Sequence, residues 1–262
     1  MDACYSKPVS DRPVILVSND DGALAPGIEH LVEVASQFGD VFVCAPSTDQ
    51  SGVSHSISLH RALRIQKVSG RPEGWFQVDG SPVDCVYVGA LHLCPRTPDI
   101  VVSGINHGYN LGTDVVYSGT VGAAREGVFR GASGLAVSTD RDADTRAAQP
   151  HVQRVLEQLV RRHRAGHVEL LNLNVPLHSE AATPMVTCHL GRRAYRDQVL
   201  ERHDLQGRPY YWIGGPPDTH AGPAGTDLAA NAKGLVTLSP ISLDASGSAS
   251  ARDEWSTDLG LD

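Results

Sequence analysis

The chain has 262 residues, of which 41% are hydrophobic and 20% are charged, a composition typical of a soluble globular protein with room for one large α/β domain. Because 30 Asp and Glu outweigh 22 Lys and Arg, the net charge of −8 argues against general electrostatic attraction to a nucleic acid polymer or to an anionic membrane. An anionic substrate would need a local positive charge, which a bound metal ion or a helix N-terminus can supply.

Short apolar runs alternate with helix-like segments over the first two thirds of the chain. We expect strands at 14–17, 41–45, 100–103, 135–137 and 168–175, and helices at 26–38, 81–93, 120–130 and 150–164. The segment 59–78 is β-like but less regular, which indicates an antiparallel excursion. Repeated strand-then-helix units predict a three-layer, Rossmann-like α/β fold around a parallel sheet.

A change of composition at about Pro176 marks the end of the predicted core, residues 1–176. The following region, 177–243, is richer in Gly, Pro, Arg and aromatic residues, and strands are expected at 209–213 and 235–238. We interpret it as a smaller β-rich extension that completes the fold. The tail 244–262 is rich in Ser, Ala, Gly and Asp and is expected to be mobile.

The sequence also predicts a cytoplasmic protein. Residues 1–13 lack the basic-then-apolar pattern of a signal peptide, and no apolar run approaches the ~18 residues that suggest membrane spanning. The five cysteines are widely spaced, are odd in number and contain no C-x-x-C pair, so we expect free thiols rather than a disulfide framework or a zinc site.

Two adjacent carboxylates, Asp20 and Asp21, directly follow the first predicted strand. Open α/β sheets bind ligands at the carboxyl ends of their strands, so this position favours a functional role. A turn at Gly22 can bring both carboxylates toward one ion. Oxygen ligands with no His or Cys nearby suit Mg²⁺ or Mn²⁺ better than Zn²⁺. Taken alone, however, such a motif is more often an ordinary turn.

Further polar loops follow the next strands and strengthen the functional interpretation. The loop after the second strand offers the hydroxyl of Ser51 as another oxygen ligand, although a plain polar loop is the alternative. The loop 103–112 contains three glycines and two asparagines, which is costly backbone flexibility for a mere connector. Loops that follow successive parallel strands gather at one edge of the sheet.

A possible phosphate site lies where Ser118, Gly119 and Thr120 open a predicted helix. The free N–H groups of the first helical turn and the helix dipole can hold a phosphate there. The alternative is an ordinary Ser or Thr cap, which is commoner than an anion site. The neighbouring polar loops favour the phosphate interpretation.

The motifs together resemble the SurE family of stationary-phase survival nucleotidases. The resemblance spans nearly the whole chain in the family's order, and ordered motifs of this length are highly specific. It is carried by segments 17–22, 25–28, 45–46, 50–52, 99–106, 117–120, 172–176, 211–214 and 226–227, with Pro240 after them.

The resemblance implies a metal-dependent phosphomonoesterase that acts on 5′- and, for some relatives, 3′-nucleoside monophosphates or short polyphosphate. It implies one Mg²⁺ or Mn²⁺ per subunit, homodimers or homotetramers that exchange C-terminal elements, and a role for residues 177–243 in oligomerisation. We expect Asp20 and Asp21 to be catalytic, and Ser118, Gly119, Thr120 and Asn106 to bind the substrate phosphate. The implied metal ligands are Asp20, Asp21, Ser51 and Asn106.

Several features stay open at this stage. Asp20 can act as base, as nucleophile or as ligand only. The segment His107-Gly108-Tyr109 departs from many relatives beside the site, which puts base preference in question. The pair His163 and His167 is interpreted as a helix end rather than as a metal site. His55 and His107 can donate to a phosphate or be solvated, and Arg125 and Glu126 are expected to be surface charges.

Two rival classes are weighed against the hydrolase. An oxidoreductase or noncatalytic nucleotide-binding Rossmann module would need a glycine-rich G-x-G-x-x-G turn after the first strand. This chain instead places two acids there, which would repel a pyrophosphate. A regulatory or assembly protein on the same fold is the second rival, because fold does not dictate function.

Overall fold

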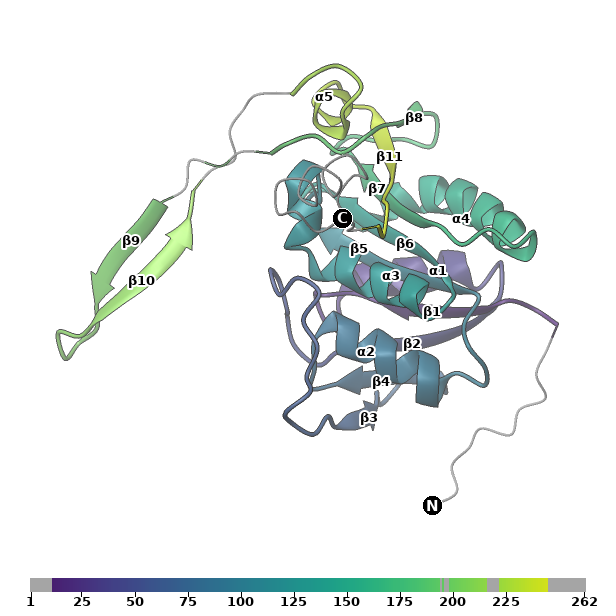
Figure 1. Ribbon diagram of the computed structural model, residues 1–262, viewed down its shortest axis with the longest axis horizontal. Coiled ribbons are helices and arrows are strands. Elements are labelled where there is room, and N and C mark those ends of the chain that lie inside the picture. Colours follow the sequence, from purple (N-terminus) through teal and green to yellow (C-terminus); the bar gives the residue numbers. More distant parts are fainter. Residues whose placement is uncertain (1–10, 194, 196–197, 216–221, 245–262) are drawn as a thin grey trace, which may run out of the picture.

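The central strand β1 (Val14–Ser18) is buried along its whole length in the computed structural model, which describes residues 11–193, 195, 198–215 and 222–244 (Figure 1). Its apolar run Val-Ile-Leu-Val has no polar face, as expected for a parallel strand that helices cover on both sides. β1 pairs in parallel with β2 (Asp40–Pro46) and with β5 (Ile100–His107).

Within the described residues, nine strands form one sheet in the order β3-β4-β2-β1-β5-β6-β7-β11-β8. In this spatial order, the strands β4, β2, β1, β5, β6 and β7 are all parallel to one another. The edge strand β3 is antiparallel to β4, and β11 is antiparallel to β7. The remaining strands of this sheet are β3 (Ile65–Lys67), β4 (Trp75–Val78), β6 (Ser133–Thr139), β7 (Leu170–Val175), β8 (Met185–Thr187) and β11 (Val236–Pro240).

Helices cover both faces of the sheet and complete three layers. On one face α1 and α4 pack against the largest apolar cluster, and on the other face α2 and α3 pack together against two smaller ones. The helices are α1 (Pro26–Ala35), α2 (Pro82–Val88), α3 (Gly119–Phe129), α4 (Gln149–Arg164) and α5 (Asp227–Asn231), with shorter turns η1 (Gly89–Leu93), η2 (Gly112–Val116) and η3 (Thr145–Ala148).

The predicted parallel α/β fold is confirmed, as is the antiparallel excursion near β3. The differences are local. The helix expected over 81–93 is α-helical only to Val88 and continues as the π-helical turn η1. The strand expected at 100–103 extends to His107, so the polar residue Asn106 lies on β5 itself rather than on a loop.

The C-terminal region is partly built into the main sheet. The expected strand at 235–238 is β11, which pairs with β7, and β8 was not expected from the sequence. Two further strands, β9 (Gln198–His203) and β10 (Pro209–Gly214), form a separate antiparallel hairpin that projects away from the core (Figure 1). Beyond Asp244, the tail expected to be mobile lies outside the described residues.

Two further expectations concern membrane and redox chemistry. None of the helices in the described part of the chain is long and apolar enough to cross a bilayer. The four cysteines within the described residues are free thiols, as expected, and the fifth, Cys4, lies outside them.

Glu126 corrects one expectation, because it is not a surface charge. It is 3% exposed on α3, where His55 Nε2 lies 3.0 Å from one carboxylate oxygen and Arg130 Nε donates to the other at 2.7 Å. Arg130 also lies over the ring of Tyr87. A buried charge needs such partners, and these contacts fasten the loop that carries His55 onto α3. Arg125 is half-buried, and burial lowers its pKa.

We expect Glu126→Gln to lower the free energy of unfolding at pH 7 by about 2–3 kcal/mol, because it weakens two charge-assisted hydrogen bonds in a buried site. Burial alone would raise the pKa of Glu126, but hydrogen bonds from His55 and Arg130 outweigh burial and lower it. The charged form therefore stabilises the fold above the ordinary value of 4.5, and this contribution is lost as the pH falls through the lower folded value.

Urea unfolding at pH 7 and at pH 4 measures this effect. The difference between the wild type and Glu126→Gln should shrink at the lower pH. The matched control is Glu157→Gln at an exposed position of α4, which we expect to change stability by less than about 0.5 kcal/mol. Equal effects of the two substitutions would contradict the buried-charge interpretation.

Candidate functional site

The turn after β1 is held closed by Asn19, a buried side chain. Its Nδ2 donates to the Gly22 carbonyl at 2.9 Å, and its Oδ1 accepts from the Gly22 N–H at 3.1 Å. Gly22 has φ +110°, a conformation that other residues rarely adopt. The Ala23 N–H then donates to the Pro46 carbonyl at the end of β2. Asn19 and Gly22 therefore fix the backbone from which Asp20 and Asp21 project.

Asp20 is 4% exposed and is bound to the start of α3. The Thr120 N–H donates to Asp20 Oδ2 at 3.0 Å, and the Thr120 hydroxyl donates to Asp20 Oδ1. Burial raises the pKa of Asp20 to about 6, although the bonds from Thr120 act in the opposite direction. The carboxylate thus lies where β1 meets α3, with little water around it.

Asp21 faces the loop after β2 and the end of β5. Burial raises its pKa and the charge of Asp49 adds to this, whereas a backbone hydrogen bond from His107 acts against it. The Gln50 N–H donates to the Asp20 carbonyl at 2.8 Å. The loops after β2 and at the end of β5 therefore both meet the acidic turn, as their place at one edge of the sheet predicts.

The oxygen atoms at this edge fit a hard divalent ion. Asp21 Oδ2 is buried and has no hydrogen-bond partner among the described residues, which is costly for a carboxylate unless a cation lies beside it. The Asn106 amide nitrogen donates to the Gly108 carbonyl at 2.7 Å, so its oxygen is left to accept. Ser51 Oγ donates to Asp49 and keeps its lone pairs.

A metal at this position would take two carboxylates and two neutral oxygens. Within the described residues, no three His, Cys, Asp or Glu side chains form a group that could hold a metal ion. Carboxylate, amide and hydroxyl oxygens are the ligands that Mg²⁺ and Mn²⁺ prefer.

Most hydrogen-bonding groups at the start of α3 already have partners within the protein, which the sequence did not suggest. The Ser118 hydroxyl accepts from the Val121 N–H at 3.1 Å, as an N-cap does, and Thr120 donates to Asp20 with both its N–H and its hydroxyl. Among the described residues, no acceptor takes the Gly119 N–H. The cap interpretation is therefore confirmed for Ser118, and the Gly119 N–H is the donor of this turn that a phosphate would use.

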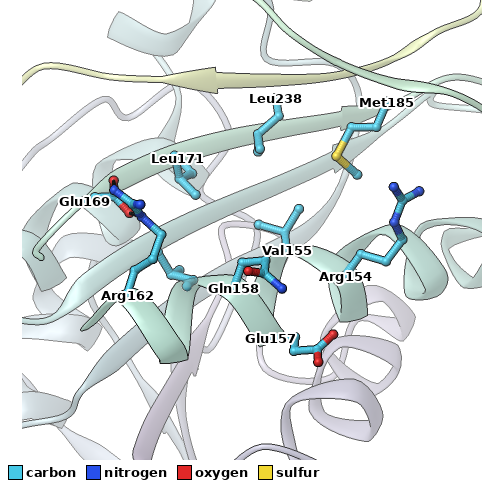
Figure 2. A pocket seen from close by; sticks show the side chains of 10 residues that line it. Arg154, Val155, Glu157, Gln158, Arg162, Glu169, Leu171, Met185 and Leu238 are labelled. Carbon is cyan, nitrogen blue, oxygen red and sulfur yellow. Dashed lines mark hydrogen bonds and ion pairs between the residues drawn. The ribbon is translucent and has the colours of Figure 1, made fainter. Parts of the chain in front are cut away.

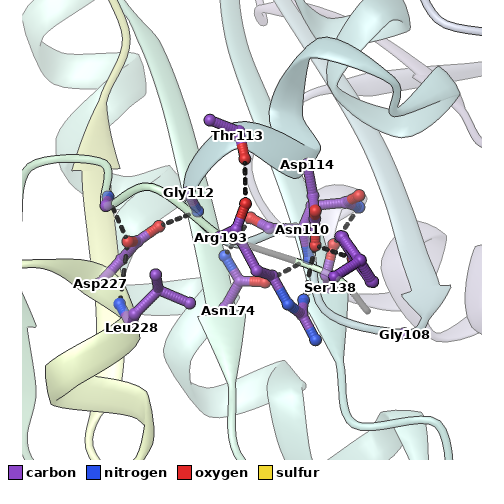
Figure 3. Close-up of polar contacts among 12 residues, drawn as sticks. Gly108, Asn110, Gly112, Thr113, Asp114, Ser138, Asn174, Arg193, Asp227 and Leu228 are labelled. Carbon is purple, nitrogen blue, oxygen red and sulfur yellow. Dashed lines mark hydrogen bonds and ion pairs between the residues drawn. The ribbon is translucent and has the colours of Figure 1, made fainter. Parts of the chain in front are cut away.

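A network that the sequence did not reveal fixes the loop between β5 and α3 (Figure 3). The Asn110 N–H donates to Asn174 Oδ1 at 2.8 Å, and the Asn110 carbonyl accepts from Asn172 at 2.8 Å and from Asn174 at 3.1 Å. Asn110 Nδ2 donates to Ser138 Oγ at 2.8 Å. Alternating Asn172 and Asn174 on an otherwise apolar β7 was the available signal, because buried amides need partners.

Residues from the C-terminal region hold the next part of the same loop. Asp227 accepts the Gly112 N–H at 2.7 Å, Arg193 forms an ion pair with Asp114 at 2.5 Å, and the Thr113 hydroxyl donates to the Arg193 carbonyl at 3.0 Å (Figure 3). The loop is thus bound to two regions that lie far away in the sequence.

Tyr109, His107 and His163 differ in where they lie relative to the acidic pair. The Tyr109 hydroxyl accepts from the Leu177 N–H at 3.2 Å and also contacts Asp140 and Asn231, so this side chain is anchored away from the acidic pair. Burial raises the pKa of Tyr109 to about 12. His107 meets Asp21 through its backbone. His163 contacts Ser133 and Asp99 at the amino ends of β6 and β5, whereas the acidic pair lies at the carboxyl end of β1. These contacts agree with a non-metal role for His163.

A pocket of ≈ 460 Å³ lies elsewhere, between α4 and strands β7, β8 and β11 (Figure 2). Its floor is apolar, with Val155, Leu171 and Leu238, and the ion pair between Arg162 and Glu169 closes part of its rim. No residue of the acidic turn or of the loops around it lines this pocket. It is therefore separate from the candidate site.

Comparisons with known proteins show which family and which fold this chain resembles. Residues 15–197 match the family model described as "Survival protein SurE". The chain is 44% identical to the 5′-nucleotidase SurE of Sorangium cellulosum, over 89% of this chain and 91% of that protein, and 45% identical to that of Chloroflexus aggregans, over 88% and 93%. A crystal structure of the SurE protein from Aquifex aeolicus superposes with a TM-score of 0.78 at 31% identity, covering 95% of this chain and all of that one.

We expect Thr120→Val to raise the pKa of Asp20 above its value of about 6 in the metal-free protein, because the substitution removes a hydroxyl donor to the charged carboxylate. Carboxyl-carbon NMR titration measures this pKa directly. Thr183→Val is the matched control, since that hydroxyl accepts from the Glu180 N–H in the turn after β7 and has no bond to Asp20. An Asp20 pKa that is equal in all three proteins would contradict the contact.

Proposed function

Because the chain belongs to the SurE family, we propose that it is a divalent-metal-dependent phosphohydrolase that releases phosphate from nucleoside monophosphates. The relatives at 40–45% identity are named 5′-nucleotidases, which supports a phosphoric monoester hydrolase. We extend the proposal to 3′-nucleoside monophosphates and short polyphosphate as further substrates. Mg²⁺ or Mn²⁺, one ion per subunit, is the proposed cofactor.

The observation that carries this proposal is the buried, unpartnered oxygen of Asp21, which follows Asp20, the residue bound to the start of α3. An anion-binding helix start and a cation-binding carboxylate pair lie next to one another, because Thr120 contacts Asp20 directly. A phosphate monoester needs both kinds of group around it during hydrolysis. The turn interpretation of the two aspartates explains neither the buried oxygen nor the contact with α3.

Asp20, Asp21, Ser51 and Asn106 would hold the ion. When bound, such an ion neutralises charge on a phosphate oxygen and lowers the pKa of a coordinated water. The Gly119 N–H and the Ser118 hydroxyl proton would then hold the remaining phosphate oxygens and orient the ester for attack, while Thr120, which donates to Asp20, keeps this turn beside the acidic pair. Asp20, held by the Thr120 N–H, would place the ion beside the start of α3. No activated Ser or Cys nucleophile is required for this chemistry.

We expect Asp21→Asn to lower kcat/KM for nucleoside monophosphates by about 10³-fold, because loss of a charged metal ligand removes several kcal/mol of transition-state stabilisation. Mn²⁺ binding measured by calorimetry should weaken in parallel. The assay compares 5′- and 3′-nucleoside monophosphates and polyphosphate with Mg²⁺, with Mn²⁺ and with chelator.

The matched control is Asp142→Asn, an exposed aspartate in the loop after β6, which should keep both activity and Mn²⁺ affinity. Full activity of Asp20→Asn or of the wild type in chelator would refute metal dependence. Nucleotide binding without turnover in every condition would instead support the noncatalytic alternative.

We also propose that the chain forms a homodimer or homotetramer through the β9–β10 hairpin. All twelve residues of its two strands are exposed, and they include the apolar side chains Val199, Tyr211, Trp212 and Ile213. A lone two-stranded hairpin is marginally stable in water, and exposed apolar strands with free edges tend to pair with another chain. A second copy would cover these side chains.

We expect Trp212→Ser to reduce the number of subunits, as measured by size-exclusion chromatography with light scattering. Trp212 is 64% exposed, and Leu91, which is 59% exposed on η1, provides the matched control Leu91→Ser. The control should leave the subunit number unchanged. An unchanged mass for Trp212→Ser, or a monomeric wild type, would overturn the proposed interface.

A further inference from the structure

Asp227 is a fully buried carboxylate that no ion pair of the described residues neutralises. Its Oδ2 accepts from the Gly112 N–H at 2.7 Å, and its Oδ1 accepts from the N–H groups of Gly191 at 2.8 Å and Leu228 at 2.9 Å (Figure 3). Backbone donors therefore compensate for the burial of this charge. Only one of the three donors, Gly112, belongs to the loop that leads into the candidate site.

The contact between Gly112 and the C-terminal region is tight. Gly112 has φ +55°, and a Cβ atom there would lie 2.6 Å from the Gly191 carbonyl oxygen. No side chain fits in this space, so the two backbones lie directly against one another. Asp227 thus joins three separate segments at one point.

The chain from Gly112 to α3 is short and internally bonded. Gly112 begins η2, and the Asp114 carbonyl accepts from the N–H groups of Tyr117 at 2.9 Å and Ser118 at 3.1 Å. Ser118 then caps α3. Because this stretch is short and its turns are hydrogen-bonded, a shift of Gly112 moves the start of α3 with it.

We infer that Asp227 is a positioning residue, which sets the start of α3 relative to the acidic pair by holding Gly112. The expected effect on kcat rests on the proposed function, whereas the positioning of α3 by Asp227 does not. Within the described residues Asp227 makes no hydrogen bond to Asp20 or Thr120, so it acts through η2. Small errors in the alignment of a reacting group are costly, and a shift of about 1 Å can reduce the rate by about 100-fold.

The closing experiment uses Asp227→Asn, which is nearly isosteric. The amide oxygen can still accept from Gly191 and Leu228, while the amide NH₂ group places a donor against the Gly112 N–H and breaks that contact. We expect kcat for the best nucleoside monophosphate to fall about 10- to 100-fold, with KM changed less than about threefold. The split arises because phosphate still binds but is misaligned with the acidic pair.

Asp99→Asn is the matched control for loss of stability alone. Asp99 also accepts a backbone N–H, that of Val14 at 2.7 Å. It directly precedes β5, at the amino ends of the parallel strands, whereas the candidate site lies at their carboxyl ends. We expect this variant to have a lower melting temperature and a wild-type kcat. An equal kcat loss in the two variants, or a wild-type kcat in Asp227→Asn, would overturn the inference.

Hydrogen exchange provides a readout that does not depend on activity. Amide exchange over 112–121 should accelerate in Asp227→Asn, whereas exchange over β6 should not change. If the wild type hydrolyses no nucleotide, the proposed function fails, and this exchange comparison alone decides the positioning role. Unchanged exchange over 112–121 would refute it.

Gly112→Ala provides a second route if Asp227→Asn does not fold. The added methyl group forces Gly112 away from Gly191 and leaves the carboxylate of Asp227 in place. We expect the same fall in kcat and the same faster exchange over 112–121. Wild-type behaviour of Gly112→Ala would show that the position of this residue does not control α3.

Discussion

Two hydrogen bonds from Thr120 to the Asp20 carboxylate join the end of the central strand to the start of α3. They bring an acid and a helix N-terminus together, whereas each would otherwise be an isolated charge in a dry environment. The helix start favours a nearby negative charge, and the carboxylate satisfies donors that the helix leaves open. The other site loops are arranged around this contact: Gln50 bonds to the Asp20 backbone, and His107 bonds to Asp21.

Much of the fold was predictable because it follows from periodic burial. The runs 14–17 and 100–102 are wholly apolar, which indicated parallel strands, and Ser118 and Gly22 indicated a helix start and a turn. The location of the acidic pair followed from the rule that parallel strands end at one edge. β9 was not predicted, because Gln198–His203 is largely polar and its residues are exposed on both faces.

The supporting residues of the site could not be predicted, because their partners lie far away in the sequence. Asp227 is 115 residues from Gly112, and Asn174 is 64 residues from Asn110. No local pattern reports such a pairing. Glu126 was assigned to the surface for the same reason: on a helix of small residues, only the positions of His55 and Arg130 show that the carboxylate faces inward.

The long reach of the Asp227 contact has a consequence for synthesis of the chain. A ribosome-bound chain that has emerged as far as β7 contains the central strands, α3 and the acidic turn, and it can bury most of the apolar core. It lacks Asp227 and also β11, which completes one side of β7. Closing a loop of this length is entropically costly and slow. The core can therefore form during translation, while the final shape of the loop before α3 awaits the last part of the chain.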